Sequence, residues 1–158
     1  MKFLYWLEDS FIGVWVAQSW GYPLVLSAHA VGMSIVVGTV LMINLRLLGF
    51  SATLPFTIFR DLNRVAWLGV SLNVLSGLAL FSGNPVKFFF HPVFWIKISL
   101  IVLGGVSVWW GLRSCRETGF NTNVLESSTK IKIVAIFSIS LWIAAIVAGR
   151  LIAYLKLF

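Results

Sequence analysis

The residues best suited to chemistry in this chain are its two histidines, His29 and His91. A neutral imidazole nitrogen binds transition metals and is a common axial ligand of haem iron. His29 lies inside the almost wholly apolar stretch LSAHAVGMSIVVGTVLMINLRLLG, and His91 lies between three phenylalanines and a proline. The single cysteine, Cys115, excludes an intrachain disulfide and a thiolate metal cluster. The sequence contains no metal-site spacing, nucleophile–base pair or phosphate-binding loop, so catalysis by side chains alone is not indicated.

The composition defines the class of protein that must position these histidines. Of the 158 residues, 59% are hydrophobic and 11% are charged, and the mean hydropathy is +0.97. Soluble domains carry about 25% charged residues, and a bilayer removes charge because ionised groups are costly in hydrocarbon. The net charge of +7 comes from basic residues at the ends of apolar segments, without a basic patch interleaved with aromatic residues. We therefore predict an integral membrane protein whose partner is the lipid bilayer and not a nucleic acid.

Four segments are long enough to cross a bilayer, which takes about 20 apolar residues in a helix. The predicted spans are approximately Tyr22 to Leu48, Val65 to Ser82, Val93 to Leu112, and Ile131 to Tyr154. Short connections carry helix breakers or charge, among them Pro55, Arg60, Asp61 and Arg64 in the first loop. The predicted fold is an all-α, four-helix antiparallel transmembrane bundle over residues 21–158, because backbone groups in lipid must be satisfied within each helix.

The N-terminal segment, residues 1–20, is apolar but too short to span, and Glu8 and Asp9 interrupt it. We interpret it as an interfacial amphipathic helix whose tryptophans lie at the headgroup level. Seven basic residues flank the first and third loops, against four on the opposite side. By the positive-inside rule, both termini are expected to be periplasmic.

This topology brings the ionisable residues to one side of the membrane. A rise of 1.5 Å per residue places His29 roughly 10 Å into the bilayer, and Lys97, six residues beyond His91, reaches about the same depth. The residues expected to gather in the outer half are His29, His91, Lys97, Lys87 and Arg150. Such a cluster suits a haem b, with imidazole on the iron and cationic side chains beside the propionates.

Small residues could make room for a flat macrocycle. Gly32 lies near His29 in the first span, and Gly69, Asn73 and Gly77 in the second recur every four residues and so share one face. The alternative is that these residues serve close helix packing, their more common role in membranes. His29 could likewise be a hydrogen-bond partner of a neighbouring helix, His91 a solvated loop residue, Lys97 a snorkelling cation, and Arg150 an interfacial anchor.

The stretch YPLVLSAHAVGMSIVVGTVLMINLRLLG resembles the first span of an uncharacterised group of bacterial four-helix membrane proteins. The segments LNVLSGLALF and NPVKFFFHPVFWIK continue the resemblance as far as Lys97, although Asn44 stands where an acidic residue is expected. More distantly, a histidine in helix one and a lysine early in helix three are similar to membrane-bound protoporphyrinogen oxidases, and the histidine also to copper resistance D proteins. The resemblance implies the bacterial inner membrane and haem b held by the His29–Lys97 pair.

Three functions therefore remain open. The first is a haem b-binding subunit for electron transfer on the periplasmic side, with His29 as ligand and His91 or Lys97 as the second ligand or a close neighbour. Position favours Lys97, whereas chemistry favours His91, since a lysine must first lose its proton. The second is a cofactor-free accessory subunit of a larger membrane complex, and the third is a porphyrin-directed oxidoreductase. Expected protein partners are other membrane or periplasmic redox subunits, or a second copy of the chain.

Overall fold

The computed structural model describes residues 2–18, 20–50, 58–117 and 128–154, and all regular structure in these ranges is helical. Four helices are long and apolar enough to cross a membrane. These are α3 (Gly21–Leu47), α4 (Ile58–Ser82), α6 (Pro92–Glu117) and α8 (Thr129–Tyr154). The predicted all-α, four-span membrane fold is confirmed; α4, α6 and α8 include the apolar segments predicted for them, and α3 ends one residue before the predicted limit, Leu48.

Helix α4 begins earlier than its apolar segment. Arg60, Asp61 and Arg64, which we expected in the first loop, lie in its opening turns. Ser51 and Pro55, and most of the third loop, lie outside the described residues. Hydropathy marks where a helix enters hydrocarbon, whereas the helical hydrogen bonds continue into the polar region, so the element is longer than the span.

The N-terminal segment forms two short helices, α1 (Lys2–Glu8) and α2 (Phe11–Gln18), where we expected one. Ser10 causes the break. Its hydroxyl donates to the Leu7 carbonyl at 2.6 Å and accepts from the Gly13 N–H at 3.1 Å. The second bond caps the start of α2, because a serine at this position satisfies an N–H that has no partner within the helix.

Helix α3 ends in a complete glycine cap at the LRLLG motif. Gly49 has a φ of +93°, its N–H donates to the Arg46 carbonyl at 3.1 Å, and the Phe50 N–H donates to the Leu45 carbonyl at 3.0 Å. This pair of bonds is the Schellman motif, which needs a residue in the left-handed backbone conformation, and only glycine adopts that conformation readily. The motif therefore terminates the first span.

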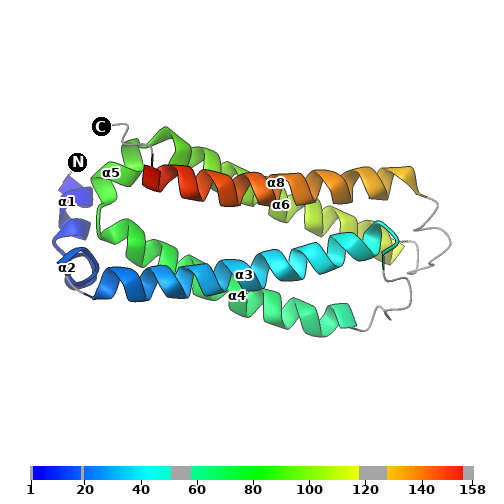
Figure 1. The fold of residues 1–158 in the computed structure, drawn as a ribbon, viewed down its shortest axis with the longest axis horizontal. Helices are drawn as coiled ribbons and strands as arrows, with labels where there is room; N and C mark the ends of the chain where they lie inside the picture. The colour runs from blue at the N-terminus through cyan, green and yellow to red at the C-terminus, as the bar shows by residue number, and fades with distance from the viewer. Residues whose placement is uncertain (1, 19, 51–57, 118–127, 155–158) are drawn as a thin grey trace.

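The four long helices form two closely packed pairs, α3 with α4 and α6 with α8 (Figure 1). The pairs are joined mainly by α3 with α8, whereas α4 makes few contacts with α6 or α8. The end of α8 lies at the end of the bundle that carries α1, α2 and the six-residue helix α5 (Pro85–Phe90). We call this the α5 end and the opposite one the loop end.

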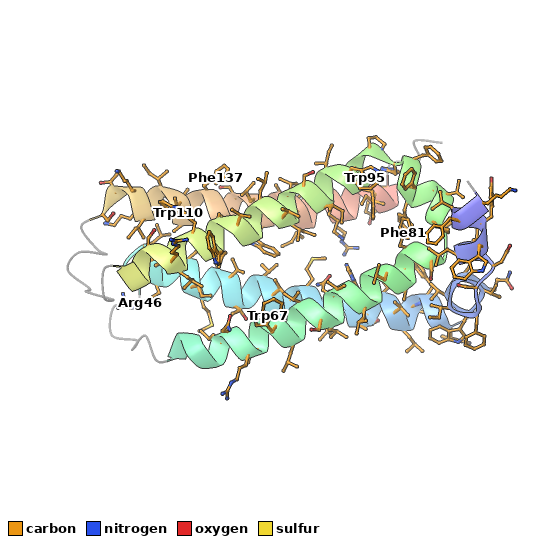
Figure 2. The ribbon with its side chains drawn as sticks, turned by 180° about the vertical axis from the view of Figure 1, so that it is seen from behind. Arg46, Trp67, Phe81, Trp95, Trp110 and Phe137 are labelled. Atoms are coloured by element: carbon orange, nitrogen blue, oxygen red, sulfur yellow. The ribbon has the colours of Figure 1, made fainter. Side chains whose placement is uncertain are left out.

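The two pairs are held together by different contacts at the two ends. At the loop end, the apolar core consists of Ile43, Leu47, Ile131 and Ala135. Beside it Asn44, only 1% exposed, donates from Nδ2 to Ser138 Oγ on α8 at 3.1 Å. At the α5 end, stacked and tilted rings link α4, α5 and α6 through Phe81, Phe88 and Phe94. Figure 2 shows Phe81 at this end and Arg46 at the opposite one.

Candidate functional site

His29 lies eight residues into α3, about 12 Å along the helix from its first residue. The half-buried ring crosses to α4, where its Nδ1 lies 3.0 Å from the hydroxyl of Ser76. The ring also lies beside the Asn73 backbone. The interhelical hydrogen bond that we considered as the alternative role of His29 is therefore present.

The hydrogen bonds around Ser76 determine which nitrogen of His29 carries the proton. The Ser76 Oγ lies 2.6 Å from the Leu72 carbonyl and 3.2 Å from the Asn73 carbonyl, so its single hydrogen is directed to the shorter contact. The Ser76 oxygen must then accept from Nδ1–H of His29. In a neutral imidazole, the lone pair is consequently on Nε2. This is the tautomer that metal-ligating histidines use, with the second nitrogen donating to an oxygen.

The glycines of α4 lie in the contact with α3. A Cβ on Gly77 would be 3.3 Å from Cε1 of His29, and a Cβ on Gly69 would be 2.7 Å from Cγ2 of Ile35. A Cβ on Gly32 of α3 would be 3.0 Å from the backbone nitrogen of Asn73. The groove formed by Gly69, Asn73 and Gly77 is thus filled by α3 itself. At Gly69 this groove serves helix packing, as Gly32 does on the α3 side, and at Gly77 the groove accommodates the imidazole.

Lys97 of α6 reaches toward the same region from the second helix pair. A Cβ on Gly149 of α8 would lie 3.4 Å from both Cε and Nζ of Lys97, so the lysine stem passes over that glycine. The ammonium group acts electrostatically on the His29 ring. The expectation that Lys97 and His29 lie at similar depth agrees with this proximity. In the described part of the chain, no carboxylate forms an ion pair with Lys97.

His91 is the residue that joins α5 to α6, and it is only 3% exposed. A solvated loop histidine, which we considered the more ordinary role, does not agree with this burial. Its backbone N–H donates to the Phe88 carbonyl at 3.2 Å, and its carbonyl accepts from Phe94 at 3.0 Å, so the two helices meet tightly there. Along α6, His91 is about 9 Å nearer the α5 end than Lys97.

The remaining two cations predicted for the site are exposed. Arg150 follows Gly149 but its side chain is accessible, as expected of an interfacial anchor. Lys87 lies in the last turn of α5 and lines a separate small cavity with Tyr22 and Asn84. Of the eight predicted site residues, the described contacts therefore group His29, Gly32, Asn73 and Gly77 in one seam between α3 and α4, with Lys97 close by.

Sequence reasoning missed Ser76 and Gly149, which contact the two central side chains. Serine in a membrane helix most often bonds its own preceding carbonyl, so Ser76 carries no distinguishing signal. Its position on the face shared with Asn73 was the only available hint. In the described part of the chain, no group of three or more His, Cys, Asp or Glu residues could hold a metal ion. A bare metal ion therefore lacks a protein cage here, whereas haem iron needs only one or two protein ligands.

Fold and site together define a multi-pass α-helical membrane protein in which a histidine and a lysine from different helix pairs come within electrostatic reach. The chain matches the family of unknown function DUF6644 over residues 3–155, and it belongs to that family. No curated protein and no solved structure matches the chain. The family match covers all four spans, but its description assigns no activity to them.

Proposed function

We propose that this protein is a haem b-binding membrane subunit that transfers electrons, in which His29 would hold the haem iron. The observation that carries the proposal is the Nδ1 hydrogen bond from His29 to Ser76 at 3.0 Å, which leaves the lone pair on Nε2. A bound haem b would supply one-electron redox chemistry at its iron. A porphyrin-directed oxidoreductase, the function suggested by the distant likeness to membrane protoporphyrinogen oxidases, would use His29 together with Lys97.

The donor groups around His29 fit this cofactor. Ser76 holds the ring in one orientation and one tautomer, which is the outer-shell support that ligating histidines usually have. Lys97 contributes a positive charge that has no described carboxylate partner, so it can pair with a propionate or, once deprotonated, bind iron. His91 is the other candidate for the second ligand. By the positive-inside rule, these residues lie in the periplasmic half of the membrane.

The test is the visible spectrum of the full-length protein purified from haem-replete cells, oxidised and reduced with dithionite, together with a pyridine haemochrome assay. We expect about one haem b per chain and sharp reduced bands that disappear in His29→Ala. Ser76→Ala should weaken haem binding tenfold to a hundredfold, the usual effect of removing the partner of a ligating histidine. A featureless wild-type spectrum would refute the proposal.

A matched control separates the hydrogen bond from a general effect of removing a serine hydroxyl. Ser99 of α6 is exposed, and among the described residues its hydroxyl bonds only the Trp95 carbonyl of its own helix, at 3.0 Å. Ser99→Ala should retain the wild-type haem content. Comparing His91→Ala with Lys97→Gln then identifies the second ligand, because only its loss should convert a six-coordinate spectrum to a five-coordinate one.

A second candidate function is a cofactor-free accessory subunit of a larger membrane complex. It is favoured by a shallow, apolar groove of about 540 Å³ between α6 and α8. One wall carries Ser140, Ala144 and Ala148 at four-residue spacing, the pattern that lets a neighbouring membrane helix approach closely. A colourless protein that copurifies with a stoichiometric membrane partner would support this function over the first.

A further inference from the structure

A small cavity at the α5 end of the bundle lies outside the haem proposal. Its volume is about 190 Å³, and its walls come from α2, α3, α4, α5 and the turn between α4 and α5. Its lining includes three apolar and three polar residues: Val16, Leu80, Phe88, Tyr22, Asn84 and Lys87. Val16 is almost fully buried, and its Cγ1 would lie 2.9 Å from a Cβ on Gly83, so α2 packs tightly on the turn that follows α4.

The size of this cavity limits what it can hold. Pockets for drug-sized ligands and cofactors are about 300–1,000 Å³. A cavity of about 190 Å³ is below that range and can enclose a single headgroup-sized fragment, with the rest of the molecule outside. It is too small for a porphyrin.

The polar groups of the cavity are all able to donate hydrogen bonds. Lys87 provides an ammonium group and is its only charged lining residue, and no ion pair to a carboxylate is found within the described ranges. Asn84 precedes α5, but its side chain makes no capping bond, which leaves its amide available. Tyr22 adds a phenolic hydroxyl. A cation with two neutral donors is a set that favours an anionic oxygen ligand such as phosphate.

The position of the cavity indicates which phosphate would reach it. Exposed aromatic residues surround this end of the bundle, among them Trp6 on α1 and Trp20 just before α3. Tryptophan and tyrosine concentrate at the level of the lipid headgroups, so Tyr22 at the start of α3 lies at that level. The phosphate groups of the adjacent leaflet are therefore at the height of Lys87.

We propose that this cavity binds the phosphate of an anionic phospholipid headgroup through Lys87, Asn84 and Tyr22. The lipid would join the short helices α2 and α5, at this end of the bundle, to α3 of the first helix pair. The proposal uses none of the residues around His29 and does not depend on haem binding.

The experiment is native mass spectrometry of the full-length protein in detergent, titrated with phosphatidylglycerol and, separately, with phosphatidylcholine. We expect one phosphatidylglycerol to be retained in preference to phosphatidylcholine and its affinity to fall about fivefold in Lys87→Gln, the effect of one basic residue near a membrane surface. Asn84→Ala should weaken binding in the same direction. Lys2→Gln is the control, because Lys2 is an exposed cation on α1 that does not line the cavity.

Each other outcome overturns the proposal. Equal losses in Lys87→Gln and Lys2→Gln would indicate diffuse attraction to the surface charge of the protein. Displacement of the lipid by millimolar inorganic phosphate would identify a site for free phosphate instead of a headgroup. Displacement by a short-chain quinone would assign the cavity to a neutral ring, and no preference for phosphatidylglycerol would exclude anion recognition. Circular dichroism melts of each variant show whether a lost site reflects a lost fold.

Discussion

Replacement of Gly32 by alanine tests whether α3 and α4 are packed as closely as the structure requires. A Cβ at this position would lie 3.0 Å from the Asn73 nitrogen, 3.1 Å from the Gly69 carbonyl oxygen and 3.3 Å from the Asn73 Cα. All three are backbone atoms of α4, so no side chain can rotate away from the added methyl group. The two helices must separate by a few tenths of an ångström, or the substitution must be accommodated by strain.

The magnitude follows from two opposing terms. Overpacking of a close contact costs about 1–3 kcal/mol. Alanine also has a higher helix propensity than glycine, which contributes about 0.5–1 kcal/mol of stabilisation in a helix interior. Gly38 lies in the same helix and has no atom within 4 Å of the position of its Cβ. Gly38→Ala therefore gains the propensity without the clash, and the two variants should differ by about 1–3 kcal/mol in the free energy of unfolding.

The assay is unfolding of the detergent-solubilised protein by sodium dodecyl sulfate, followed by circular dichroism. Gly38→Ala should unfold at a higher denaturant fraction than Gly32→Ala, with the wild type between them or close to Gly38→Ala. If Gly32→Ala is as stable as Gly38→Ala, the close approach of α3 to α4 is wrong. The hydrogen bond between His29 and Ser76, which spans the same seam, would then lose its structural basis.

Two further predictions concern the second helix pair and the contact between the pairs. Gly104→Ala should destabilise the protein by about 1–3 kcal/mol, because its Cβ would lie 2.8 Å from Nε1 of Trp142, while Gly105→Ala, with nothing within 4 Å, should be neutral or stabilising. Equal melting temperatures of the two variants would contradict this packing. Ser138→Ala removes the interhelical acceptor of the Asn44 amide, which keeps its bond to the Val40 carbonyl of its own helix, and should cost about 0.6 kcal/mol, and at most about 1.7, as interhelical hydrogen bonds in membranes do. A loss well above that range, measured by the same unfolding assay, would mean that the hydroxyl supports more than this one bond.

The candidate site could be predicted only in part. Lys97 could be predicted to lie at a depth close to that of His29, because the rise per residue of a helix is constant and the spans run antiparallel. The backbone and aliphatic atoms that Gly32 and Gly69 face on the partner helix could not be predicted in this way. The burial of His91 was not expected either, since we took a histidine in a loop before proline to be solvated.

The number of spans and their approximate limits can be predicted from the order of the amino acids alone. Apolar length is a local property, and a segment surrounded by lipid must satisfy its backbone hydrogen bonds as a helix, whatever its neighbours are. The end of α3 at Gly49 is local for the same reason, because the glycine cap closes within the helix that it ends.

Which helix faces meet, and which polar atoms they bring together, becomes clear from the three-dimensional packing of the helices. In a soluble bundle the apolar face of each helix marks its contact surface, but lipid is as apolar as a protein core, and helices α3, α6 and α8 are hydrophobic all round. Small residues at four-residue spacing then indicate that a helix packs closely there, but they do not indicate which helix it is. The pairing of α3 with α4 places Ser76 against His29. It depends on the shapes of both helices together, so it cannot be predicted from either segment alone.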